Sequence, residues 1–139
     1  MLSRRVSTGL SIGLIVLSVV AGIVVWPRLP AEMAIHFSVT GTPDNYVSKP
    51  VAVGLLPAIM AATLLFLAGA FRVDPPDDPR VAAVTTVSTM GLMAAIQALV
   101  LAWNLGYPVP FDLVIVGVVV WGAALVGYVA ARERGWSLA

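Results

Sequence analysis

Near its N-terminus the chain reads TGLSIGLIVLSVVAGIVVW at residues 8–26, a run that contains no charged side chain. A helix needs about 20 mostly apolar residues to cross the hydrocarbon core of a bilayer, and this run comes close to that length. Three further apolar runs follow at 51–71, 81–103 and 111–131, and none of them has Asp, Glu, Lys, Arg or His in its middle. The sequence therefore predicts four transmembrane helices.

The overall composition favours lipid rather than water as the surrounding medium. Of the 139 residues, 60% are hydrophobic and only 11% are charged, whereas a soluble domain carries about 25% charged residues. In water, such a chain would have too few polar groups to cover its surface. The predicted fold class is all-α integral membrane: one domain over residues 1–139, built as a four-helix transmembrane bundle with a turn-rich loop at 27–50.

The first run resembles a secretory signal because Arg4 and Arg5 precede it. The run is long, however, and it ends in Trp26-Pro27-Arg28 rather than at a small-residue cleavage site. We therefore interpret it as a retained anchor.

The basic residues predict the orientation, since the cytoplasmic loops of membrane proteins carry an excess of Lys and Arg. Arg28 and Lys49 lie on the side of the 27–50 loop. The opposite side holds Arg4, Arg5, Arg72, Arg80, Arg132 and Arg134. We therefore expect a multi-pass plasma-membrane protein with cytoplasmic N- and C-termini and an extracytoplasmic loop. Aromatic residues that suit the headgroup region fall near the run ends: Trp26, Trp103, Tyr107, Tyr128 and Trp136.

Small residues at steps of four predict where the helices approach one another, because close backbone contact drives helix association in lipid. We expect these stripes to make contacts within one bundle, with a homo-oligomer seam as the alternative. The stripes are Gly9/Gly13, Ser18/Gly22, Gly54/Ala58/Ala62 and Ala123/Gly127/Ala131. Of the polar groups in the spans, the amide of Gln97 would cost the most free energy if it faced lipid. We therefore expect it to form an interhelical hydrogen bond, with a small polar path as the alternative.

The 27–50 loop has a predictable local structure. Pro27 and Pro30 end the first helix, and residues 34–39 are compatible with an extended stretch. Residues 41–44 predict a tight turn, with glycine permitting a positive φ and proline fixing the next bend.

Two helix starts are also predicted. Ser48 supplies a hydroxyl cap and Pro50 a first-turn proline for the second helix. Asp112 is expected to cap the fourth helix, because a carboxylate suits a helix N-terminus.

The loop also carries ten positions at fixed spacing: Leu29, Pro30, His36, Phe37, Gly41, Pro43, Asp44, Tyr46, Ser48 and Lys49. With this spacing, residues 27–70 resemble the membrane domain of unknown function 1648, the N-terminal domain of SdpI-type immunity and signalling proteins. Ala34 departs from the pattern, since the family commonly has proline there. SdpI-type proteins are longer and carry a second signature, which we do not find in this chain.

The resemblance and the loop together predict a binding, immunity or signalling module that recognises a peptide, lipid or protein partner. The residues expected to bind the partner or to structure the loop are His36, Phe37, Gly41, Pro43, Asp44, Tyr46, Ser48 and Lys49. We expect His36 to hydrogen-bond Asp44 or the turn backbone, Asp44 to pair with Lys49, and the rings of Phe37 and Tyr46 to be buried. The alternative function is an oligomeric transporter or channel for ions or small solutes.

Catalysis is not expected. The chain contains no cysteine, which excludes disulfides and thiolate sites. His36 is the only histidine; a lone imidazole could sense pH, but with Glu32 and Asp44 it makes a poor zinc site. We therefore expect no metal, no cofactor and no nucleic acid, and we expect membrane lipid as a partner.

Overall fold

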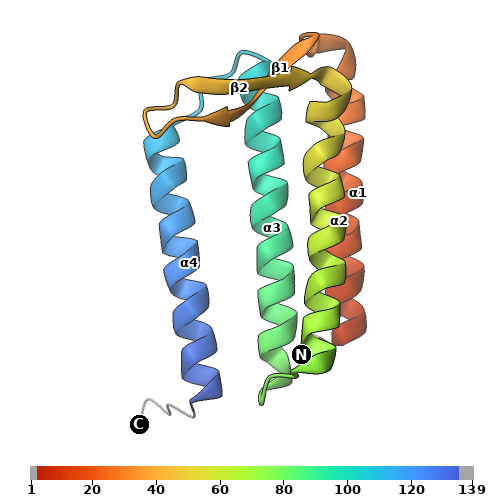
Figure 1. Cartoon of the computed structure of the whole chain (residues 1–139), viewed down its shortest axis with the longest axis vertical. Helices are drawn as coiled ribbons and strands as arrows, with labels where there is room; N and C mark the ends of the chain where they lie inside the picture. The colour runs from red at the N-terminus through yellow and green to blue at the C-terminus, as the bar shows by residue number, and fades with distance from the viewer. Residues whose placement is uncertain (1–2, 135–139) are drawn as a thin grey trace.

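The computed structural model describes residues 3–134, and it consists mainly of four long helices that run alternately up and down (Figure 1). Each helix is long and apolar enough to cross a bilayer. The four predicted spans are thus confirmed, and the chain is a multi-pass membrane protein. Trp136 and both ends of the predicted 1–139 domain lie outside the described residues. The helices are α1 (Arg4–Val25), α2 (Lys49–Val73), α3 (Pro79–Asn104) and α4 (Phe111–Glu133).

The segment between α1 and α2 folds into a β-hairpin that lies over one end of the bundle (Figure 1). A short 3₁₀ helix, η1 (Trp26–Arg28), is followed by the strands β1 (Glu32–Phe37) and β2 (Pro43–Ser48). The two strands pair in antiparallel fashion. Many backbone N–H and C=O groups of this segment are therefore hydrogen-bonded between the strands. The loop predicted as turn-rich is therefore more regular than expected, and we call this end of the molecule the hairpin end.

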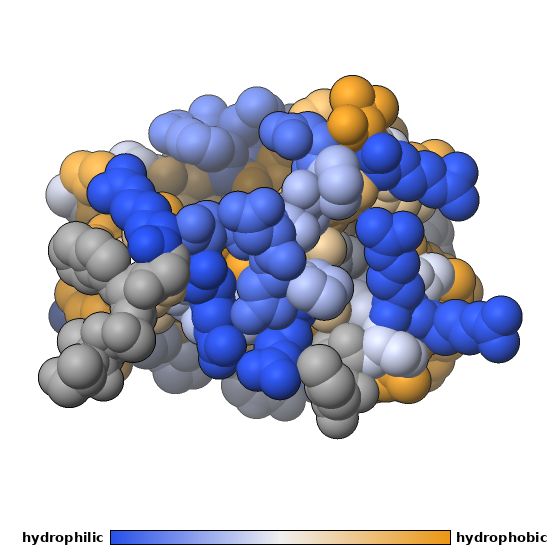
Figure 2. Space-filling view, turned by 90° about the horizontal axis from the view of Figure 1, so that it is seen from below, coloured by the Kyte–Doolittle hydropathy of each residue, from blue (hydrophilic) through white to orange (hydrophobic). Residues whose placement is uncertain are grey.

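The opposite end, which we call the arginine end, holds the start of α1 and α3 and the last turns of α2 and α4. Hydrophilic side chains gather on this face (Figure 2). Its arginines are Arg4, Arg5, Arg72, Arg80, Arg132 and Arg134. The two ends therefore differ in charge, as the sequence predicts.

The core lies mostly along α3 and under the hairpin. Met33 of β1, Val53 of α2 and Leu101 of α3 are buried in one cluster together with Leu29 and Ala52. Further down the bundle, Met60 and Met90 are fully buried. Helix α3 contributes eight buried residues, so it is the central helix of the bundle.

Small residues mark one close helix contact, between α1 and α2. A Cβ atom at Gly22 would lie 2.5 Å from Val53 Cγ1, so only glycine permits this approach. Ser18 of the same predicted stripe is also buried.

The other predicted small-residue stripes make no close helix contact, and that prediction is wrong for them. Added Cβ atoms at Gly9 and Gly13 would meet no atom within 4 Å. Five members of the stripes on α2 and α4 are exposed: Gly54, Ala58, Ala62, Ala123 and Gly127. The physical reason is that small residues are compatible with a lipid-facing surface as well as with a helix contact. The homo-oligomer seam stays a prediction.

The two predicted side-chain caps are also absent. Ser48 is the N-cap residue of α2 but its side chain makes no cap hydrogen bond; β2 runs directly into α2, and Lys49 N donates to Ala31 O at 2.8 Å instead. Pro110 is the N-cap residue of α4, so Asp112 lies inside the first turn. There its carboxylate contributes charge near the positive end of the helix dipole.

Candidate binding surface at the hairpin end

Asn104, the last residue of α3, fixes β1 to the bundle. Ala34 N donates to Asn104 Oδ1, and Asn104 Nδ2 donates back to Ala34 O, both at 2.9 Å. Nδ2 also donates to Val100 O at 2.8 Å within α3. The amide thus pairs with the edge of β1 as a neighbouring strand would.

The sequence analysis did not single out Asn104. The only signal was a polar amide at the end of an otherwise apolar span, directly after Trp103. The partner in this contact is Ala34, the position where the family pattern commonly has proline. A proline there would have no N–H to donate, so the alanine is what permits the paired contact with Asn104.

Three aromatic rings join the hairpin to both α3 and α4. Phe37 of β1 lies 5.3 Å from the Trp103 ring and 4.7 Å from the Phe111 ring, measured between centroids. Trp103 and Phe111 are 5.4 Å apart and edge-to-face. These separations are typical of stabilising aromatic pairs. The sequence predicts that Phe37 buries its ring; the residue is half-buried, and the ring packs on partners from two different helices.

Gly41 closes the hairpin turn against this aromatic cluster. Its φ is +81°, a conformation that L side chains rarely adopt. In addition, a Cβ atom at Gly41 would lie 2.6 Å from Phe111 Cδ2. The predicted positive φ at Gly41 is thus confirmed, but the turn lies at 38–42 rather than at 41–44, because Pro43 already begins β2 and Ser38 pairs with Thr42. The glycine is needed for space as well as for backbone geometry.

His36 and Asp44 are hydrogen-bonded across the hairpin. Of the two predicted partners of His36, Asp44 and the turn backbone, the structure shows Asp44. His36 Nδ1 lies 2.5 Å from Asp44 Oδ1, and the two side chains are 69% and 47% exposed. An exposed pair of this kind contributes at most about 1 kcal/mol to stability. Its structural effect is to fix the polar rim of the turn.

Lys49 does not pair with Asp44, so that prediction is wrong. Lys49 Nζ donates to Trp26 O at 3.1 Å and lies 5.3 Å from the centre of the Trp26 ring. The physical reason is that Lys49 begins α2 beside η1, where a backbone carbonyl and an aromatic face are both within reach. Lys49 therefore joins η1 to α2 rather than closing the hairpin.

Tyr46 is not buried, which corrects another prediction. Its side chain is 56% exposed. Helix α3 contacts β1 but not β2, and Tyr46 pairs with Ala34 rather than with Phe37, so it lies away from the aromatic cluster. Pro43 and Ser48 begin and end β2. Of the eight predicted loop residues, the structure thus brings five together near the turn: His36, Phe37, Gly41, Pro43 and Asp44.

A cavity of about 500 Å³ lies below β1, between the hairpin-end halves of α3 and α4. Its wall is apolar except at His36 and Ser38. The remaining lining residues are Ile35, Phe37, Val39, Ile96, Leu99, Val100, Val109, Phe111, Val114, Ile115 and Val118. We call this space the hairpin cavity; it is bounded above by β1 and by the aromatic cluster.

Gln97 is buried and donates from Nε2 to Val53 O of α2 at 3.3 Å. The predicted interhelical hydrogen bond is confirmed. Gln97 does not line the hairpin cavity, so its amide helps to hold α3 against α2.

Comparison with known proteins supports the resemblance at the hairpin end. No curated protein matches the chain, and no solved structure does. Residues 13–61 match the family model for a domain of unknown function, DUF1648. The match begins inside α1, includes the whole hairpin and ends inside α2, whereas the loop motif predicted a resemblance over 27–70. The segment that builds the hairpin end is thus similar to the DUF1648 membrane domain.

Proposed function

We propose that the protein is a membrane-embedded binding module whose hairpin end, on the outer face, takes an apolar segment of a peptide between α3 and α4. The observation that carries this proposal is the hairpin cavity. Its volume of about 500 Å³ is in the range of ligand pockets, which measure about 300 to 1,000 Å³. A cavity with apolar walls under a polar hairpin suits a ligand that has both an apolar and a polar part.

The charges around the cavity favour a basic peptide. Asp112 is exposed, follows Phe111 directly and makes no ion pair within residues 3–134. Asp44 lies on the same rim, bonded to His36. These carboxylates would attract Lys or Arg of a peptide that approaches from water, while its apolar side chains enter between Leu99 and Val114.

The resemblance of the loop motif to SdpI-type proteins is what suggests an immunity or signalling role for this binding. In such a role the protein sequesters a membrane-active peptide or reports its presence. Neither role requires a chemical step, so we propose that the protein is not an enzyme. The alternative of an oligomeric transporter stays a prediction; a solute flux into proteoliposomes that depends on Gln97 would favour it.

Photo-crosslinking tests the proposal. We would place the photoreactive residue p-benzoylphenylalanine at Leu99, which lines the cavity. The matched control is Leu55 of α2, which is 41% exposed, lies at a similar distance from the hairpin end and does not line the cavity. After irradiation of intact cells, mass spectrometry would identify the adducts.

We expect a peptide adduct at position 99 that is absent at position 55, and that disappears when Val114→Trp fills the cavity. Lipid adducts alone at both positions would show that the cavity is part of the ordinary lipid-facing surface. A peptide adduct of equal yield at both positions would contradict the site.

A further inference from the structure

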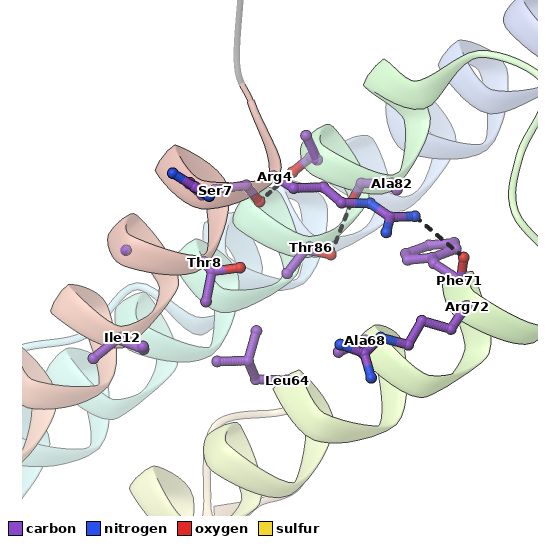
Figure 3. Close-up of a pocket in the computed structure, with 13 residues that line it drawn as sticks. Arg4, Ser7, Thr8, Ile12, Leu64, Ala68, Phe71, Arg72, Ala82 and Thr86 are labelled. Atoms are coloured by element: carbon purple, nitrogen blue, oxygen red, sulfur yellow. Dashed lines mark hydrogen bonds between the residues drawn. The ribbon is translucent and has the colours of Figure 1, made fainter.

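A second cavity lies at the arginine end, between α1, α2 and the start of α3, and we call it the arginine groove. Its volume is about 540 Å³. Arg4 of α1 and Arg72 of α2 line it at one end, and Ile12 and Leu64 line it deeper in the bundle (Figure 3). Arg5 of α1 also lines the groove. The groove is thus on the opposite end of the molecule from the hairpin cavity.

The positive charge of the arginine groove is not neutralised by the protein. Within residues 3–134, the three arginines of the groove make no ion pair. Arg132 at the same end does pair with Asp78, at 3.3 Å. Helix α1 also starts here and has no acidic residue in its first turn, so the positive end of its dipole adds to the local potential.

One arginine is already held across the groove. Arg4 Nη2 donates to Phe71 O in the last turns of α2 at 3.5 Å, and Figure 3 shows the side chain reaching from α1 toward α2. This contact uses one of five guanidinium donors. The remaining donors, with those of Arg5 and Arg72, stay available for an anion.

The deeper part of the groove is apolar and open. Ile12 is 50% exposed, and an added Cβ atom at Gly9 would meet nothing within 4 Å. At a rise of about 1.5 Å per residue, Ile12 lies about 12 Å further into the bundle than Arg4. The groove therefore passes from headgroup depth into the hydrocarbon region.

We propose that the arginine groove binds an anionic phospholipid of the leaflet at this end. The phosphate lies between Arg4 and Arg72, and one acyl chain lies along Ile12 and Leu64. A phosphate group matches the planar fork of the guanidinium, and basic pockets between transmembrane helices suit anionic headgroups. Free inorganic phosphate would satisfy the arginines but would leave the apolar wall uncovered, which is why we assign the site to a lipid.

Native mass spectrometry of the purified full chain tests this assignment. The probes are phosphatidylglycerol, phosphatidylcholine and inorganic phosphate. We expect phosphatidylglycerol to be retained about tenfold better than phosphatidylcholine, and a molar excess of inorganic phosphate not to displace it. Equal retention of the two lipids, or displacement by inorganic phosphate, would overturn the proposal.

Charge variants locate the site. Arg4→Gln with Arg72→Gln should lower phosphatidylglycerol retention about tenfold, and Arg72→Lys should have an intermediate effect because it keeps the charge but loses the fork. Arg80→Gln is the matched control, since Arg80 is exposed at the same end and does not line the groove. A loss for Arg80→Gln as large as that for the double variant would mean only a general surface attraction.

A steric pair keeps the test independent of charge. Gly9→Phe should fill the groove and reduce retention, whereas Gly13→Phe should not. Both glycines have open space around them, but only Gly9 lines the groove. Circular dichroism would first establish that both variants are helical, and equal retention by the two variants would contradict the proposed course of the acyl chain.

Discussion

Helices α3 and α4 are both long and apolar enough to span a membrane, yet their environments differ. Helix α3 contacts α1, α2, α4 and β1 and has eight buried residues. Helix α4 lies beside α3 alone among the helices and touches β1 through the rings of Phe111 and Phe37, and no residue from Phe111 to Glu133 is buried. In lipid an apolar side chain gains little by leaving the acyl chains for protein. Hydropathy therefore marks a span but does not tell whether that span is central or peripheral.

Helix α4 is joined to the rest of the protein mainly at its two ends. At the hairpin end, Phe111 packs on Phe37 and Trp103. At the arginine end, Glu133 accepts hydrogen bonds from Asp77 N and Asp78 N at 3.0 and 3.3 Å. The hairpin cavity lies next to the part of α4 below Phe111, so the loose packing of α4 is what leaves this space open.

The largest expected effect comes from removing a central side chain of α3. Met90→Ala should lower the free energy of unfolding by about 3 kcal/mol, because Met90 is fully buried and its loss leaves a cavity. The matched change on α4 is Leu113→Ala, at a residue that is 65% exposed. This substitution should change the free energy of unfolding by less than about 0.5 kcal/mol. Unfolding in mixed micelles measures both, and equal costs would show that α4 is packed as tightly as α3.

The next effect concerns the contact of the hairpin turn with α4. Gly41→Ala should lower the free energy of unfolding by about 2 kcal/mol, because of the unfavourable positive φ and the close contact with Phe111. Gly106→Ala is the control, since its φ of +88° is similar but its Cβ would meet no atom within 4 Å. Gly106→Ala should lower the free energy of unfolding by about 1 kcal/mol. If the two substitutions cost the same, the approach of Gly41 to Phe111 is not a close one.

A smaller effect is expected where α3 holds β1. Asn104→Ala should cost about 1.5 kcal/mol, because it leaves the N–H and C=O of Ala34 without their partner. Asn45→Ala, at an exposed asparagine of β2, should be nearly neutral. Amide hydrogen exchange gives a second measurement: the Ala34 amide should exchange faster in Asn104→Ala. Unchanged exchange would mean that β2 alone holds β1 in place.

The sequence predicted the four spans, the positive φ at Gly41 and the His36–Asp44 contact, because each depends on local residues or on a single short loop. It did not predict the pairing of Asn104 with Ala34 or that of Lys49 with Trp26. These contacts join segments that are distant in the chain, and many other partners had the same chemistry. The small-residue stripes were ambiguous for a different reason: Gly22 and Gly54 look alike in sequence, although one contacts Val53 and the other is exposed.

The central claim is that a bilayer separates the hairpin end from the arginine end, and cysteine labelling tests it most directly. The chain has no cysteine of its own, so Asn45→Cys on β2 and Asp77→Cys between α2 and α3 each introduce a single thiol. A membrane-impermeant maleimide should label position 45 in intact cells and position 77 only after permeabilisation. Labelling of both positions from the same side would contradict the account, because the two ends would then share one aqueous compartment.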